Sequence, residues 1–155
     1  MDSSRTLVYW CFLILGISSL LPWNLYMTAH QYFSYKLRNT TTWPSNSSSA
    51  PIGNYSLTPL QRTFETYLTA SGSAISIVGA VGNTLLTSKL TNGVRVSVGH
   101  LFVFLPLLPT IALAWINTDE EQVGFFVATL LLGNIANLAA NGFIGGGAMG
   151  LAARF

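Results

Sequence analysis

The chain has 155 residues, of which half are hydrophobic and only 8% are charged. Soluble domains carry about 25% charged residues, so this composition indicates an integral membrane protein. The formal net charge of +2 comes without a run of basic residues, which argues against nucleic-acid binding, and the single cysteine, Cys11, excludes an intrachain disulfide.

Four apolar segments are each long enough to cross a bilayer, which takes about 20 residues in a helix. We expect transmembrane helices at residues 7–32, 66–88, 96–117 and 123–153. The second segment is the least apolar, because several serines and threonines dilute it. The expected fold class is an all-α integral membrane protein with four transmembrane helices.

The first segment ends with groups that are costly in lipid. Pro22 removes one helical hydrogen bond, and Asn24 carries an amide that lipid cannot satisfy. Helices interrupted in this way usually face protein or a water-filled cavity, and transporters build solute sites from them. This stretch is therefore the first candidate for a functional site.

A polar segment between the first two helices contains three Asn-x-Ser/Thr sequences. Their acceptor asparagines are Asn39, Asn46 and Asn54. Three such sequences in one segment favour glycosylation and a luminal or extracellular location. An unmodified flexible loop is the alternative, because such a sequence is only a potential acceptor.

This segment sets the predicted topology, because helices alternate in direction across the bilayer. The predicted order is a cytosolic N-terminus 1–6, helix 7–32, external loop 33–65, helix 66–88, cytosolic loop 89–95, helix 96–117, external loop 118–122, helix 123–153 and cytosolic end 154–155. Four basic residues would then be cytosolic and three external, which supports this orientation only weakly.

The fourth apolar segment carries three amides on one helical face. Asn134, Asn137 and Asn141 are spaced so that 100° per residue brings them together. They could bind a polar solute or hydrogen-bond neighbouring helices, and both uses are common in membrane bundles. Glycines repeat every fourth residue at Gly142, Gly146 and Gly150. Such spacing favours close helix packing.

The sequence shows no catalytic constellation and no set of metal ligands. Neither His30 nor His100 has a carboxylate, a cysteine or a second histidine at ligand spacing. The glycine run 145–147 lies inside an apolar segment and does not follow a strand, so it is not a nucleotide-binding loop. We therefore expect no enzyme activity, no metal and no cofactor.

The first segment resembles the first helix of the equilibrative nucleoside transporter family. The resemblance begins with Pro22-Trp23-Asn24, continues through Met27-Thr28-Ala29 and Tyr32-Phe33, and extends to Asn83, Val94-Arg95, Phe125-Phe126-Val127 and Gly150-Leu151-Ala152. It implies the N-terminal part of an eleven-helix, major-facilitator-like transporter. In such proteins a nucleoside lies in a central cavity between two helix bundles and moves down its gradient by alternating access.

The resemblance also implies a set of solute-binding residues. Trp23 and Met27 would line the cavity with Leu20, and Asn24 would border the site or brace the helix. Ser73 and Ser76 would line it from the second helix. The family usually places a glutamine on its fourth helix, and Asn141 is the nearest amide here, which leaves that contact in doubt.

The function implied is facilitative transport of nucleosides, with nucleobases as a second solute class. The chain would be a truncated transporter that is inactive alone, and further C-terminal helices or another chain would complete its cavity. The plasma membrane is the expected location, with an intracellular membrane as the second choice. The alternatives are a four-helix interaction or regulatory membrane protein and a small oligomeric channel.

Overall fold

The computed structural model describes residues 3–43 and 56–153, and within them the secondary structure is helical. The elements are α1 (Ser3–Thr28), α2 (His30–Lys36), α3 (Pro59–Leu86), α4 (Asn92–Trp115), α5 (Gln122–Leu138), a π-helix (Ala139–Gly145) and α6 (Gly146–Ala152). Four helical stretches are long and apolar enough to span a membrane: Arg5–Thr28, Pro59–Leu86, Asn92–Trp115 and Gln122–Ala152. The predicted all-α, four-span fold class is confirmed.

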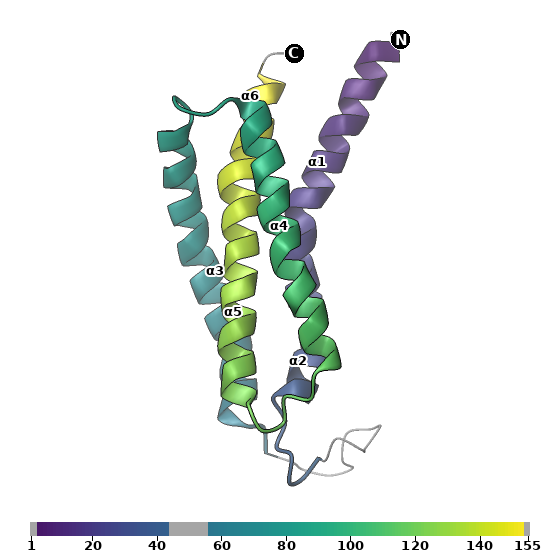
Figure 1. Ribbon diagram of the computed structural model, residues 1–155, viewed down its shortest axis with the longest axis vertical. Helices are drawn as coiled ribbons and strands as arrows, with labels where there is room; N and C mark the ends of the chain where they lie inside the picture. Colours follow the sequence, from purple (N-terminus) through teal and green to yellow (C-terminus); the bar gives the residue numbers. More distant parts are fainter. Residues whose placement is uncertain (1–2, 44–55, 154–155) are drawn as a thin grey trace.

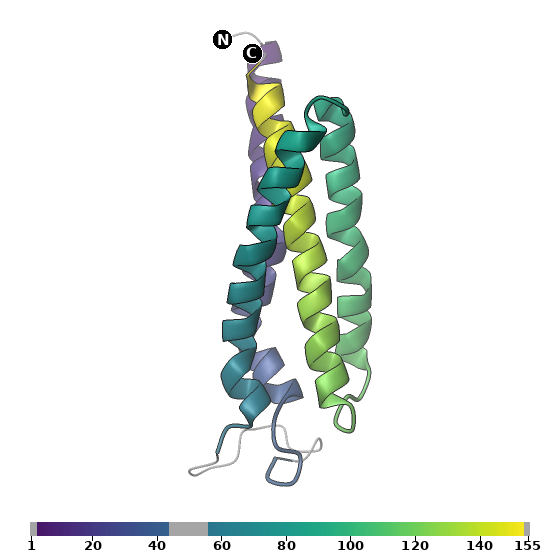
Figure 2. The same cartoon turned by 90° about the vertical axis from the view of Figure 1, so that its left-hand side faces the viewer.

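The long helices run side by side, and two ends of the bundle can be distinguished (Figures 1 and 2). The start of α1, the α3–α4 connection and α6 lie at one end, called here the α6 end. The short α2, the start of α3 and the α4–α5 connection lie at the other, called the α2 end. The central element is α5 with its π-helical continuation, which contacts α1, α3 and α4. By contrast, α1 leans away from the bundle towards its N-terminal end (Figure 1).

The start of α3 and the end of α1 can be related to the local sequence. α3 starts with a capping box, in which the Thr58 hydroxyl accepts from the Gln61 N–H at 3.1 Å and the Thr58 N–H donates to Gln61 Oε1 at 2.8 Å. α1 continues through Pro22, which is buried, and ends at Thr28 before α2 begins at His30. α3 therefore begins seven residues before the predicted span 66–88. A helix can extend beyond the bilayer, so the bounds of this span and the side of the membrane on which α3 begins remain predictions.

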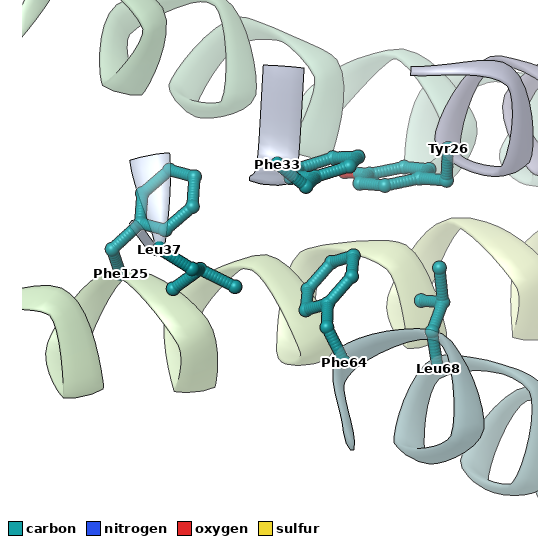
Figure 3. Packing of buried hydrophobic residues seen from close by; sticks show 6 residues of the cluster. All are labelled: Tyr26, Phe33, Leu37, Phe64, Leu68 and Phe125. Carbon is teal, nitrogen blue, oxygen red and sulfur yellow. The ribbon is translucent and has the colours of Figure 1, made fainter. Parts of the chain in front are cut away.

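An aromatic cluster holds the α2 end together (Figure 3). Its buried members are Tyr26, Phe33, Leu37, Phe64, Leu68 and Phe125. The rings of Tyr26 and Phe33 lie parallel with centroids 6.1 Å apart, and Phe33 lies 4.6 Å from Phe64. Residues from α1, α2, α3 and α5 meet here, so this cluster fixes the position of α1 against the rest.

Small residues take over the packing in the other half of the bundle. A Cβ added at Gly142 would lie 3.2 Å from the Cα and the carbonyl oxygen of Gly79. A Cβ added at Gly99 would lie 2.6 Å from Ile144 Cγ1 and 3.1 Å from the Ile144 backbone nitrogen. The π-helix therefore packs almost backbone to backbone against α3 and closely against α4, as small residues allow in membrane bundles.

Candidate functional site

A cavity of about 310 Å³ lies between α1, α3 and the central helix. Its lining residues are Ser19, Leu20, Trp23, Gly72, Ser73, Ser76, Asn137 and Asn141. Its walls combine an indole and a leucine with three hydroxyls and two amides, and pockets for small polar solutes have this mixture of apolar surface and a few placed polar groups. We call it the Trp23 cavity.

The Trp23 ring covers a backbone position that has no side chain. A Cβ added at Gly72 would lie 2.6 Å from Trp23 Cζ3, so the ring rests directly on the α3 backbone. The indole is partly buried and also packs against the aromatic cluster at the α2 end. Gly72 therefore sets the orientation of Trp23 in the cavity.

Two amides of the central helix hydrogen-bond α3 beside this ring. Asn137 is buried, and its Nδ2 donates to the Gly72 carbonyl at 2.8 Å and to Ser76 Oγ at 3.1 Å. Asn141 is exposed, and its Nδ2 lies 3.1 Å from the Asn137 carbonyl and 3.3 Å from Ser76 Oγ. Asn137 thus holds α3 and α5 together, while Asn141 keeps an exposed amide at the cavity.

The third amide of the predicted stripe binds α3 outside the cavity. Asn134 Nδ2 donates to Ser71 Oγ at 3.0 Å, and Asn134 does not line the cavity. Asn141 lies within the π-helix. Short π-helical turns are frequent at functional sites, because they change the register of the side chains that follow.

Five of the seven predicted solute-binding residues meet in this cavity. They are Leu20, Trp23, Ser73, Ser76 and Asn141. Asn24 and Met27 do not line it. Asn24 is exposed and its Nδ2 donates to the Leu20 carbonyl at 3.0 Å, one helical turn back. Met27 is 37% exposed and lies one turn beyond Trp23 towards the α2 end.

The cavity also contains three residues that the sequence reasoning did not assign to it. Asn137 belonged to the recognised amide stripe, but its spacing could not separate helix contact from solute contact. Gly72 and Ser19 were not among the candidate residues, although Ser19 lies one turn before Trp23.

Of the predicted glycosylation sites, Asn39 is the one that the structure describes. Its Oδ1 accepts hydrogen bonds from the N–H of Thr41 at 3.0 Å and from its hydroxyl at 2.6 Å. Asn46 and Asn54 lie outside the described residues. Within residues 3–43 and 56–153, no group of three or more His, Cys, Asp or Glu side chains could hold a metal ion.

Comparison with known proteins finds relatives among the equilibrative nucleoside transporters. The chain is 36% identical to equilibrative nucleoside transporter 3 of Rattus norvegicus over 121 residues, which are 76% of this chain and 24% of that protein. It is 27% identical to equilibrative nucleoside transporter 1 of Mus musculus over 134 residues, 80% of this chain and 29% of that protein. It is 30% identical to equilibrative nucleoside transporter 2 of the same species over 77% of this chain and 25% of that protein.

The chain thus spans about a quarter of the length of the curated relatives it matches. No protein-family model matches it. No solved structure matches it either.

Proposed function

We propose that this multi-pass membrane protein, a homologue of equilibrative nucleoside transporters over 76–80% of its length, binds nucleosides in the Trp23 cavity as part of a facilitative transport path. The observation that carries the proposal is the meeting of Trp23, Ser73, Ser76 and Asn141 in one cavity. An indole can stack on a flat base, and hydroxyls and amides can hydrogen-bond a base or a ribose.

The polarity of the cavity fits a neutral solute. Its lining residues include no Asp, Glu, Lys, Arg or His. Nucleosides are uncharged at neutral pH and carry several hydroxyl and ring donors and acceptors, which matches this set of groups. Nucleobases, which lack the ribose, would use the same wall with fewer hydrogen bonds.

The matched region makes up 24–29% of the relatives' length, so most of each relative has no counterpart in these residues. We propose that further helices, from the same or another chain, cover the open side of the Trp23 cavity and form the second half of the transport path. Residues 1–155 alone would then bind a nucleoside weakly and would not transport it. Cells producing only these residues should show uridine uptake no greater than empty-vector cells, and uptake above that control would contradict this part of the proposal.

Binding itself is tested with the purified chain in lipid nanodiscs and radiolabelled uridine. Trp23→Ala should reduce uridine binding most, because the stacking surface is lost, and Asn141→Leu should reduce it by removing the exposed amide. Gly72→Ala should also reduce it, because the new methyl group would displace the Trp23 ring. The matched control is Gly82→Ala on the same helix, where an added Cβ meets nothing within 4 Å.

The same measurements separate this function from the alternatives. An interaction or regulatory protein would show no uridine binding, and Trp23→Ala would then change nothing. A channel lined by the amide stripe would lose conductance when Asn134, Asn137 and Asn141 are replaced by leucine. The geometry disfavours that channel, because Asn134 and Asn137 already donate to Ser71 and Gly72 of α3.

We propose the plasma membrane as the location and glycosylation of Asn39, Asn46 and Asn54 on its outer side. Asn39 is described in a turn after α2, at the α2 end of the bundle. A mobility shift on glycosidase treatment that disappears when all three asparagines are replaced by glutamine would support both the modification and the orientation. An unchanged mobility would contradict the glycosylation.

A further inference from the structure

A second cavity, of about 410 Å³, lies at the α2 end of the bundle. It is lined by Tyr32, Tyr35, Lys36, Arg38, Ala114, Trp115, Ile116, Asn117 and Asp119. None of these residues lines the Trp23 cavity. We call it the Lys36 cavity, and the inference drawn from it does not depend on nucleoside binding. Its size falls in the range of about 300–1,000 Å³ that is usual for small-molecule pockets.

One of its two cations, Arg38, is held by three hydrogen-bond acceptors. Arg38 is 1% exposed, and its guanidinium donates to the Trp43 carbonyl at 2.7 Å, the Tyr35 carbonyl at 2.7 Å and Asp119 Oδ2 at 2.9 Å. It also lies 4.0 Å from the centroid of the Tyr35 ring. Arg38 and Asp119 therefore neutralise each other, and this pair ties the segment after α2 to the α4–α5 connection.

The other cation keeps unused hydrogen-bonding capacity. Lys36 is 8% exposed, and its ammonium donates to the Ile116 carbonyl at 2.6 Å. An ammonium has three donors, and among the described residues no carboxylate lies within ion-pair distance of this one. Burial lowers the pKa of Lys36, and the Asp119 carboxylate opposes this shift only in part.

A neutral donor beside Lys36 is also unused. The Tyr32 hydroxyl is buried and has no hydrogen-bond partner, and its ring centroid lies 6.0 Å from Lys36 Nζ. Leaving a buried hydroxyl without a hydrogen bond is unfavourable, and leaving a buried charge unpaired is more unfavourable. Both costs would fall if an acceptor carrying a negative charge entered the cavity.

We propose that the Lys36 cavity binds an anionic phosphate or carboxylate group, carried by a small solute or by a lipid headgroup. Lys36 supplies the charge-assisted hydrogen bond and Tyr32 a second donor. The rings of Tyr35 and Trp115 form apolar walls for the part of the ligand that carries the anion. The one carboxylate of the cavity is held by Arg38, so it does not repel the incoming group.

The first experiment measures binding of phenyl phosphate, an organic phosphate without a nucleoside, to the purified chain in detergent by calorimetry, with potassium chloride at equal ionic strength as the control. Saturable binding is expected, with at least tenfold weaker affinity in Lys36→Met, since this variant loses the charge-assisted hydrogen bond. Lys89→Met is the matched control, because Lys89 is an exposed lysine in the α3–α4 connection. Lys36→Arg, which keeps the charge, should retain most of the binding.

The second experiment distinguishes the source of the anion. The chain is placed in phosphatidylcholine nanodiscs with and without phosphatidylglycerol, and its thermal unfolding is followed. Stabilisation by phosphatidylglycerol that is lost in Lys36→Met indicates a lipid headgroup, whereas binding of phenyl phosphate alone, lost in the same variant, indicates a soluble ligand. If neither probe binds, or if every probe that binds does so equally well to Lys36→Met and to the unmodified chain, the proposal is overturned.

Tyr32→Phe keeps the experiment decisive if Lys36→Met does not fold. It removes one oxygen and should weaken binding of the active probe roughly two- to tenfold, as loss of one neutral hydrogen bond does. Unchanged affinity in Tyr32→Phe, with the Lys36 variant unfolded, would count against the cavity as the binding site.

Discussion

The first and last transmembrane helices have similar mean hydropathy, 1.7 and 1.8, and differ sharply in how much of each is buried. In the most apolar stretch of Arg5–Thr28, 6% of the residues are buried, whereas in that of Gln122–Ala152 the share is 44%. The last helix runs between α3 and α4, and the first leans away from them (Figure 1). In a bilayer, hydropathy therefore identifies a span but does not say whether it faces lipid or protein.

The two helices differ in burial because their side chains differ in size and in the number of amides that face other helices. The central helix brings glycines, alanines and asparagines to its neighbours, which permits backbone contact and interhelical hydrogen bonds. The first helix presents large apolar side chains outward, among them Leu7, Trp10 and Ile14. Lipid is as apolar as these side chains, so burying them would bring little gain.

The largest effect is expected from Gly142→Ala in the π-helix. The added methyl group would lie 3.2 Å from Gly79 backbone atoms, which cannot rotate away as a side chain could. Overpacking of this kind costs about 1–3 kcal/mol. Unfolding of the purified chain in mixed micelles of increasing SDS content should show this loss.

Gly16→Ala on α1 is the matched control for that substitution. A Cβ there meets nothing within 4 Å, and alanine is the better helix former, by about 0.5–1 kcal/mol. The control should therefore be neutral or stabilising. If both variants lose the same free energy of unfolding, α1 is packed as tightly as the central helix and the contrast fails.

A smaller effect is expected from Asn137→Leu. The variant loses the hydrogen bonds to Gly72 and Ser76, and interhelical bonds in membranes contribute about 0.6 kcal/mol each, with a maximum near 1.7. The matched amide on α1 is Asn24, which is exposed and bonded within its own helix. Asn24→Leu should change the free energy of unfolding by less than about 0.5 kcal/mol. Equal losses would show that α1 is held by amides as well.

These contrasts also show how far the sequence could predict the site. Hydropathy predicted the four spans, and the family resemblance predicted five residues that meet in the Trp23 cavity. The direction of a side chain depends on the angle around its helix, and Asn24 lies 100° from Trp23, so its amide turns away from the cavity. Gly72 escaped prediction because its role is the absence of a side chain beneath an indole from another helix.

The Lys36 cavity could not be predicted from the sequence either, and the reason is a different one. Lys36 and Arg38 lie in a segment whose sequence predicts a polar loop. They are buried because α2 turns this segment against the α4–α5 connection, where Asp119 and the Ile116 carbonyl accept from them. These partners are 80 or more residues away, and no local pattern connects them.

A smaller effect still is expected from Tyr26→Phe, which tests one of the few polar ties of α1. The Tyr26 hydroxyl lies 2.7 Å from Thr110 Oγ1 of α4. Phenylalanine keeps the ring in the aromatic cluster and removes this bond, so the loss should be about 0.6 kcal/mol. A loss comparable to that of Asn137→Leu would mean that α1 depends on polar contacts as much as the central helix does.

The smallest effect on stability is expected at Cys11, which makes this residue a probe of what covers α1. Cys11 is exposed and is the only cysteine of the chain, so Cys11→Ala should leave unfolding unchanged. The larger side chain of Cys11→Phe should also leave unfolding of the purified chain unchanged, because this position is exposed and lipid can accommodate the ring. Loss of stability of Cys11→Phe in cell membranes, but not in purified monomers, would show that another chain covers α1. The difference in burial between the first and last helices would then hold only for the isolated chain.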